Sequence, residues 1–124
     1  MKKLLFTLLL AGLTTTSVHA AGLLTIAGMD SCPVCTTLKK ENDWFVCKVP
    51  TGEIRKFPEE RVVYARWDTG SPVASPELVV IHINSQKITC SSIKMKKGWI
   101  ECLTPKAKYL INRYFVDYLE LVKQ

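Results

Sequence analysis

The chain has 124 residues, a formal net charge of +6, 48% hydrophobic residues and five cysteines. This length allows one domain and excludes a larger multidomain protein. A domain of this size buries a limited core, so cross-links would contribute much of its stability.

The first twenty residues have the pattern of a secretory signal peptide. A pair of lysines is followed by an apolar stretch over Leu4 to Leu13, which is too short to span a bilayer, and by the cleavage-site residues Val18-His19-Ala20. Removal of residues 1–20 takes away two lysines and no acidic residue, so the formal charge falls from +6 to +4. We therefore expect a secreted, extracellular protein without membrane insertion, and a single domain over residues 21–124.

All the cysteines lie after the signal peptide, where an oxidising environment favours disulfides. Their number is odd, so one thiol stays free or pairs with another chain, and the sequence leaves the connectivity open. The expected disulfide residues are drawn from Cys32, Cys35, Cys47, Cys90 and Cys102.

The segment that follows the signal peptide is weakly patterned. Residues Ala21 to Ser31 predict a flexible N-terminal arm or a short edge strand. From Cys32 to Pro58 the chain is broken repeatedly by proline and glycine, and Trp44-Phe45-Val46 is the one candidate for a short strand. No internal repeat is apparent.

Three longer stretches predict strands. Arg61 to Trp67 and Leu78 to Ile83 are rich in β-branched and aromatic residues, and Ile88 to Leu103 alternates before and after a break at Lys97-Gly98. A turn is expected at Asp68 to Pro72. Together these stretches predict an antiparallel meander.

The C-terminal segment predicts an amphipathic helix. Thr104 is a good N-cap and Pro105 suits the first helical position. Apolar residues then recur at helical spacing: Ala107, Leu110, Ile111, Tyr114, Phe115, Tyr118 and Val122. The expected fold class is therefore α+β, a three-stranded antiparallel sheet covered by one C-terminal helix.

This order of elements resembles the chemokine family of small secreted chemotactic cytokines. The similarity is best over residues 58–122. It includes a loop before the first strand, Arg55-Lys56-Phe57-Pro58, and Cys102-Leu103-Thr104-Pro105, which is similar to the cysteine-Leu-x-Pro that leads into the chemokine helix.

The resemblance implies a chemotactic cytokine of the immune response that binds a G-protein-coupled receptor and has no enzymatic activity. In chemokines a flexible arm enters the receptor and the following loop docks on its exterior. Carried over to this chain, the receptor-binding residues are Ala21, Gly22, Met29, Asp30, Ser31, Arg55, Lys56 and Phe57.

The resemblance also implies a basic surface that binds glycosaminoglycans such as heparin. By position its residues are Lys87, Lys94, Lys96, Lys97, Lys106, Lys108 and Arg113. An exposed sheet edge would allow a homodimer. No cofactor is implied, and export argues against nucleic acid as a partner.

The cysteine spacing departs from that family. Cys32 and Cys35 are separated by two residues, whereas chemokines have adjacent cysteines or one or three residues between them. In a second register Cys47 is the lone N-terminal cysteine, as in the single-disulfide branch. That register implies a Cys47–Cys102 bridge, which we take as the expected pair.

Two other functions fit parts of the sequence. Cys32-Pro33-Val34-Cys35 has the spacing of thioredoxin-like thiol–disulfide oxidoreductases, although the stretch between Tyr64 and Pro76 has no room for their crossover helix. A cationic host-defence protein or receptor mimic is the third hypothesis. His82 is the one histidine after the signal peptide, so no metal site and no catalytic triad are expected.

Overall fold

The structure is a computed structural model that describes residues 21–69 and 77–123. Within these ranges it contains twelve β-strands and two 3-10 turns, and no α-helix. The predicted signal peptide and most of the turn expected at Asp68 to Pro72 lie outside the described residues. No helix in the described part of the chain is long and apolar enough to cross a membrane.

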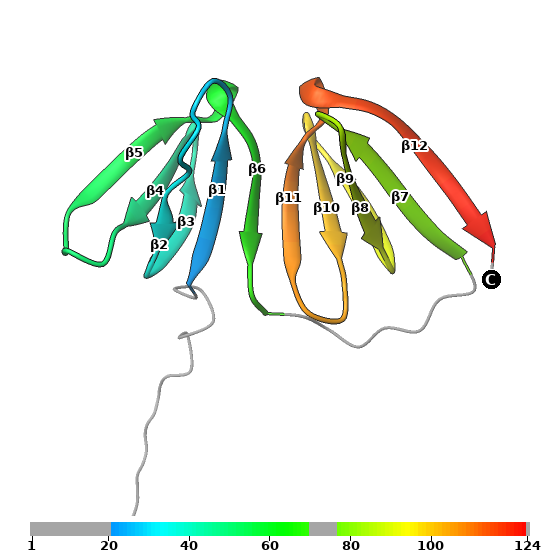
Figure 1. The fold of residues 1–124 in the computed structure, drawn as a ribbon, viewed down its shortest axis with the longest axis horizontal. Coiled ribbons are helices and arrows are strands. Elements are labelled where there is room, and N and C mark those ends of the chain that lie inside the picture. The colour runs from blue at the N-terminus through cyan, green and yellow to red at the C-terminus, as the bar shows by residue number, and fades with distance from the viewer. Residues whose placement is uncertain (1–20, 70–76, 124) are drawn as a thin grey trace, which may run out of the picture.

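The described strands divide into two modules that follow each other along the chain (Figure 1). Module 1 consists of β1 (Gly22–Ile26), β2 (Val34–Cys35), β3 (Thr37–Glu41), β4 (Trp44–Lys48), β5 (Ile54–Pro58), the 3-10 turn η2 (Glu59–Arg61) and β6 (Val62–Trp67). Module 2 consists of β7 (Glu77–Ile83), β8 (Gln86–Cys90), β9 (Ser92–Lys96), β10 (Trp99–Leu103), β11 (Lys108–Asn112), η3 (Arg113–Phe115) and β12 (Val116–Lys123).

Each module has the same strand pairing. The first strand pairs with the second and with the last, and the third, fourth and fifth strands form an antiparallel meander. Even the bulge in the last strand recurs, because Val63 and Asp117 are both skipped in the register with the first strand. The two modules are therefore repeats of one six-strand unit, and because a fold alone does not determine function, function has to be argued from the surface.

The repeat is also visible in the sequence once the modules are aligned. Cys35, Trp44 and Cys47 stand at the same positions of module 1 as Cys90, Trp99 and Cys102 in module 2. The expectation that the chain has no internal repeat is therefore wrong. The visible similarity lies mainly in the cystine and tryptophan positions and in the pattern of apolar side chains.

The two modules share one continuous sheet. Strand β6 of module 1 pairs antiparallel with β11 of module 2, which gives a six-stranded sheet in the order β2-β1-β6-β11-β10-β9. Figure 1 shows β6 and β11 side by side at the centre, with the other strands of each module on either side.

The two hydrophobic cores interlock at this junction. Core 1 lies in module 1 but includes Trp99 from β10, and core 2 lies in module 2 but includes Val63 from β6. Each module therefore contributes a side chain to the interior of the other, so the modules should unfold together.

The disulfides lie within the modules. Cys35 is bonded to Cys47 and Cys90 to Cys102, each pair twelve positions apart in the sequence. The expected Cys47–Cys102 bridge is wrong, because these two cysteines belong to different modules. The two cystines indicate folding in an oxidising compartment.

The predicted C-terminal helix is not formed, and the α+β fold class is wrong. The segment instead forms β11, η3 and β12. Strand β11 pairs with β10 and β6, and strand β12 pairs with β7. Residues such as Tyr109, Ile111 and Val116 favour strands when partner strands are present, and this tertiary pairing overrides the helical spacing.

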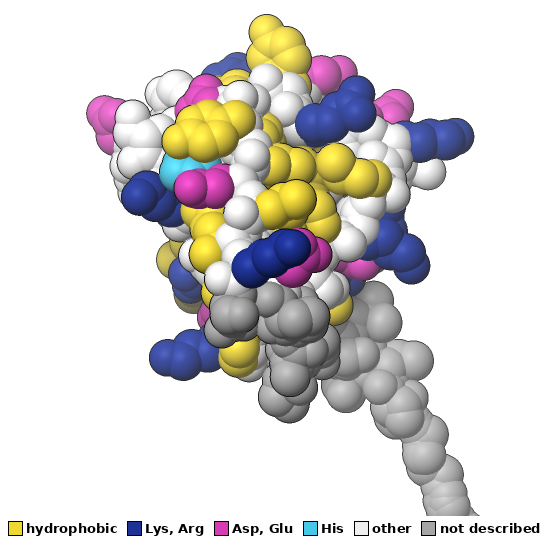
Figure 2. Space-filling model, turned by 90° about the vertical axis from the view of Figure 1, so that its right-hand side faces the viewer, with side chains coloured by type: hydrophobic (Ala, Val, Ile, Leu, Met, Phe, Trp, Pro, Cys, Tyr) yellow, Lys and Arg dark blue, Asp and Glu magenta, His cyan; other side chains and the backbone are white. Residues whose placement is uncertain are grey.

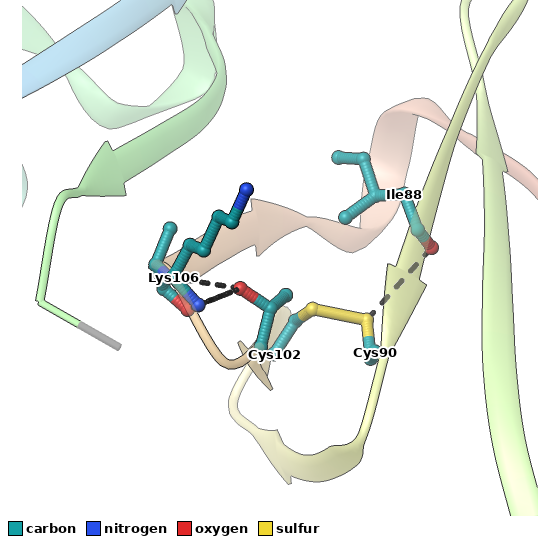
Figure 3. The surroundings of a disulfide bond; sticks show 6 residues. Ile88, Cys90, Cys102 and Lys106 are labelled. Atoms are coloured by element: carbon teal, nitrogen blue, oxygen red, sulfur yellow. Dashed lines mark hydrogen bonds between the residues drawn. A yellow bond between two sulfur atoms is a disulfide. The ribbon is translucent and has the colours of Figure 1, made fainter. Parts of the chain in front are cut away.

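Thr104, which the sequence suggested as a helix N-cap, instead stabilises a turn between two strands. Its Oγ1 accepts hydrogen bonds from the backbone N–H groups of Lys106 (3.2 Å) and Ala107 (2.8 Å), which is the pattern of an N-cap. Here the same contacts close the tight connection between β10 and β11, next to the Cys90–Cys102 disulfide (Figure 3).

Two of the longer strand predictions are confirmed, but the predicted meander is wrong, because β6 pairs with β1 and β11 rather than with β7. β6 and β7 form where Arg61 to Trp67 and Leu78 to Ile83 predicted strands, and the break at Lys97-Gly98 is the turn between β9 and β10. Of the two alternatives for residues 21–31, an arm or a short edge strand, the structure has a strand over part of the range. However, residues 22–26 are an inner strand, because Leu24 and Ile26 are buried and β1 pairs on both sides.

Candidate anion-binding cleft

An open cleft of about 770 Å³ lies along the junction between the modules. Five of its lining residues are lysines and one is acidic. The lysines are Lys39, Lys40, Lys96, Lys97 and Lys108. The remaining lining residues are Leu38, Trp67, Thr69, Trp99, Glu101 and Leu110.

The lysines come from three strands that the junction brings together. Lys39 and Lys40 lie on β3, Lys108 begins β11, and Lys96 and Lys97 lie where β9 turns into β10. This turn is tight because Gly98 adopts a φ of 69°, which favours glycine. The modules separately hold two and three of these lysines, and the shared sheet places all five around one hollow.

Glu101 is the acidic residue of the cleft and is held between two of its lysines. Its Oε2 lies 3.2 Å from Lys96 Nζ and 3.3 Å from Lys108 Nζ. Burial alone would raise the pKa of Glu101, but the hydrogen bonds and charges of the two lysines outweigh that effect and hold the pKa below its ordinary value of 4.5. Glu101 is therefore ionised at neutral pH and forms an ion pair with each of the two ammonium groups.

The two tryptophans form fixed walls. The indole N–H of Trp67 donates to the backbone carbonyl of Leu38 at 2.8 Å, and that of Trp99 donates to Glu59 Oε1 at 3.2 Å. Lys108 Nζ lies 5.8 Å from the Trp67 ring centroid, and Lys40 Nζ lies 5.8 Å from that of Trp99. Cationic and aromatic groups are thus adjacent on both sides of the cleft.

The structure brings together part of the glycosaminoglycan-binding set predicted from the sequence. Lys96, Lys97 and Lys108 line the cleft. Lys87 and Lys106 line a second, smaller hollow, Lys94 lies on β9 and Arg113 lies in η3.

The residues predicted to bind a receptor are distributed over separate elements. Gly22 is in β1, Met29 to Ser31 lie between β1 and β2, and Arg55 to Phe57 lie on β5, which belongs to a different sheet from β1. Ala21 is exposed directly before β1.

The Cys32-x-x-Cys35 spacing does not form a cystine, because Cys35 is bonded to Cys47 and Cys32 is free. The disulfide that a thioredoxin-like oxidoreductase would use is therefore not present between these two residues. His82 Nε2 lies 3.0 Å from Glu120 Oε1 and its ring stacks on Tyr118. Within the described ranges no group of His, Cys, Asp and Glu side chains is arranged to hold a metal ion.

Sequence reasoning missed Lys39, Lys40 and Trp67 as site residues. The first two stand in a visible charge cluster with Glu41, and Trp67 ends a predicted strand. Neither the charge cluster nor the strand end shows by itself which other residues lie beside it in the folded protein. Knowledge of the repeat would have helped, since it places β3 and β9 at equivalent positions of the two modules.

Comparisons with protein-family models, with curated proteins and with solved structures find no match for this chain.

Proposed function

We propose that this protein is a secreted binding protein whose inter-module cleft holds a segment of an anionic polysaccharide, such as a sulfated glycosaminoglycan. The observation that carries the proposal is the convergence of five lysines and two tryptophans on one open hollow. The signal-peptide pattern and the two cystines support export, which would expose the cleft to extracellular polyanions.

The charge balance of the cleft favours an anion. Glu101 offsets part of the charge of Lys96 and Lys108. Lys40 lies 3.3 Å from Glu59 and Lys39 lies 2.8 Å from Glu41, so these two lysines are also partly neutralised. Lys97 makes no ion pair within the described residues and is exposed. Clustered charges of one sign in a hollow attract oppositely charged ligands, and the attraction weakens as salt screens it.

The aromatic walls favour a ligand with an apolar surface besides its charges. Trp67 is partly exposed, and its ring stands beside Lys108. A sugar ring presents C–H groups that can pack on an indole, while its sulfates or carboxylates meet the neighbouring lysines. The openness of the hollow suits an internal segment of a chain, because no end group needs to be enclosed.

Heparin affinity chromatography tests the proposal, with NaCl as eluent. The variant K97Q/K108Q should elute at clearly lower salt than the wild type. K48Q/K56Q is the matched control, since Lys48 and Lys56 are exposed lysines on β4 and β5 outside the cleft. Each control substitution removes a positive charge of the same kind.

Tryptophan fluorescence gives a second readout that depends on location. A sulfated oligosaccharide bound in the cleft should alter the emission of the wild type, and Trp67→Phe should remove most of that change. Equal losses of heparin affinity for K48Q/K56Q and K97Q/K108Q would show that only net charge matters, and the proposal would then fail.

A further inference from the structure

The junction between the modules has a defined register. Strand β6 pairs with β11 so that Tyr64 faces Ile111, Ala65 faces Leu110, Arg66 faces Tyr109 and Trp67 faces Lys108. This pairing joins the last strand of one module to the fifth strand of the next.

The same two strand positions occur once more in the described part of the chain, and there each strand has one edge without a partner strand. β12 is the last strand of module 2 and ends the sheet β12-β7-β8, and β5 is the fifth strand of module 1 and ends the sheet β3-β4-β5. Figure 1 shows β5 and β12 at opposite ends of the molecule. They therefore cannot pair within one copy, but β12 of one copy can reach β5 of another.

The exposed side chains of these two edges complement each other. When the β6–β11 register is transferred to the equivalent residues, Leu121 faces Ile54 and Glu120 faces Arg55. These are an apolar pair and an oppositely charged pair, which are favourable across antiparallel strands. The same register puts Tyr118 opposite Phe57 and Leu119 opposite the stem of Lys56.

The edges also leave apolar surface uncovered. Leu121 is 67% exposed and Ile54 is 65% exposed, although both are large hydrophobic residues. Figure 2 looks onto the side of the molecule that carries β7 and β12 and shows hydrophobic side chains running across it. An exposed edge strand of eight residues with apolar side chains is a template for further pairing.

A pair of equivalent tryptophans gives a second, independent observation. Trp99 begins β10 and reaches across the junction onto Phe45 of module 1, so it is only 7% exposed. Trp44 holds the same position in module 1 and is 45% exposed. A second copy placed before module 1 in the same relation would cover Trp44, with Ile100 in the place of Phe45.

We propose that copies of this chain associate head to tail, with β12 of one copy pairing with β5 of the next in the register of the β6–β11 junction. The contact is heterologous, since different surfaces meet. Each added copy therefore leaves one β12 and one β5 free, and the assembly either extends as a filament or closes into a ring. The proposed pairing comprises four residue pairs and ends before Pro58, which has no N–H to donate to a partner strand.

Charge reversal tests the pairing by sedimentation velocity, in a Cys32→Ser background that removes the free thiol. R55E places two glutamates opposite each other at every contact, and E120R places two arginines there. Each variant should associate at least tenfold more weakly than the parent. An equimolar mixture should associate like the parent, because every mixed contact again joins Arg to Glu.

K87E is the matched control, as Lys87 is exposed on the edge strand β8 outside the proposed contact. It should associate like the parent. The proposal is overturned if the parent stays monomeric at high micromolar concentration, if K87E weakens association as much as R55E, or if the mixture stays monomeric while thermal melts show both variants folded.

Cross-linking tests the register. A chain with Ile54→Cys and Leu121→Cys, also lacking Cys32, should form a ladder of disulfide-linked multimers under mild oxidation. Ile54→Cys with Val122→Cys is the control, because neighbouring strand residues point to opposite faces. Equal ladders from both chains, or none from the first, would contradict the proposed register.

Discussion

The ring of Trp99 packs edge-on against the ring of Phe45, with their centroids 5.3 Å apart, so that a residue of module 2 completes the core of module 1. Phe45 is fully buried under it. The contact extends the connection between the modules beyond the β6–β11 backbone pairing and ties the stability of one module to the other.

Truncation of this tryptophan should therefore destabilise the whole molecule. Trp99→Ala is expected to lower the free energy of unfolding by about 3–5 kcal/mol, as for large-to-small substitutions in protein cores. Urea denaturation followed by circular dichroism measures it, and the wild type should show a single transition. Trp44→Ala, at the equivalent exposed position, should cost less than about 1 kcal/mol in dilute monomer. Similar losses for both variants would contradict this role of Trp99.

Removal of either disulfide should destabilise the protein by a similar amount. Each cystine closes a loop of the same length, and for such a loop the chain-entropy picture gives about 3 kcal/mol. Cys90→Ala/Cys102→Ala and Cys35→Ala/Cys47→Ala are expected to lower the urea midpoint by comparable amounts. Cys32→Ser should leave the midpoint almost unchanged. A large effect of Cys32→Ser would indicate that this cysteine takes part in a disulfide.

The sequence predicted strands where apolar and β-branched residues are dense, as over Leu78 to Ile83, because that pattern is local. It failed for residues 104–123, where Thr104 and the helical spacing are compatible with both structures. The decision there comes from distant partners, since β11 needs β6 and β12 needs β7. Non-local pairing of this kind has no local signature.

The same limit applies to the candidate site. Lys96, Lys97 and Lys108 were predicted to bind an anion, but the cleft also needs Lys39 and Lys40 from a strand more than fifty positions earlier.

The disulfide pairing, in contrast, could have been predicted from the sequence by recognising the repeat. Each cystine spans twelve positions and has a tryptophan three residues before its second cysteine, at Trp44 and Trp99, so the repeat pairs the cysteines within modules.

Gly22 is a structural residue of β1, which its sequence position did not reveal. A Cβ added there would lie 2.6 Å from Leu38 Cδ2 and 2.8 Å from the backbone oxygen of Arg66. Because the second contact is with backbone, the strand itself must shift, and Gly22→Ala should cost about 1–3 kcal/mol. Thermal denaturation measures the loss. Ala21→Ser, on the exposed preceding residue, is the control, and equal melting temperatures for both variants would refute the steric argument.

Glu101 should oppose anion binding while it supports the fold. Glu101→Gln frees Lys96 and Lys108 from their shared partner, so affinity for heparin should rise about two- to fivefold, in line with the modest worth of partly exposed ion pairs. Isothermal titration with a heparin oligosaccharide at fixed salt measures the change, with Glu53→Gln, outside the cleft, as the control.

The ion pairs of Glu101 with Lys96 and Lys108 should also make the free energy of unfolding depend on pH. Because the pKa of Glu101 is lowered on folding, its ionised form stabilises the native state above pH 4.5, and this contribution is lost as the pH falls through the lowered pKa. Glu101→Gln should therefore be less stable than the wild type at pH 7, and the difference should shrink below pH 4. A variant that binds heparin more weakly than the wild type, with its fold intact, would mean that Glu101 orients the lysines for the ligand rather than competing with it.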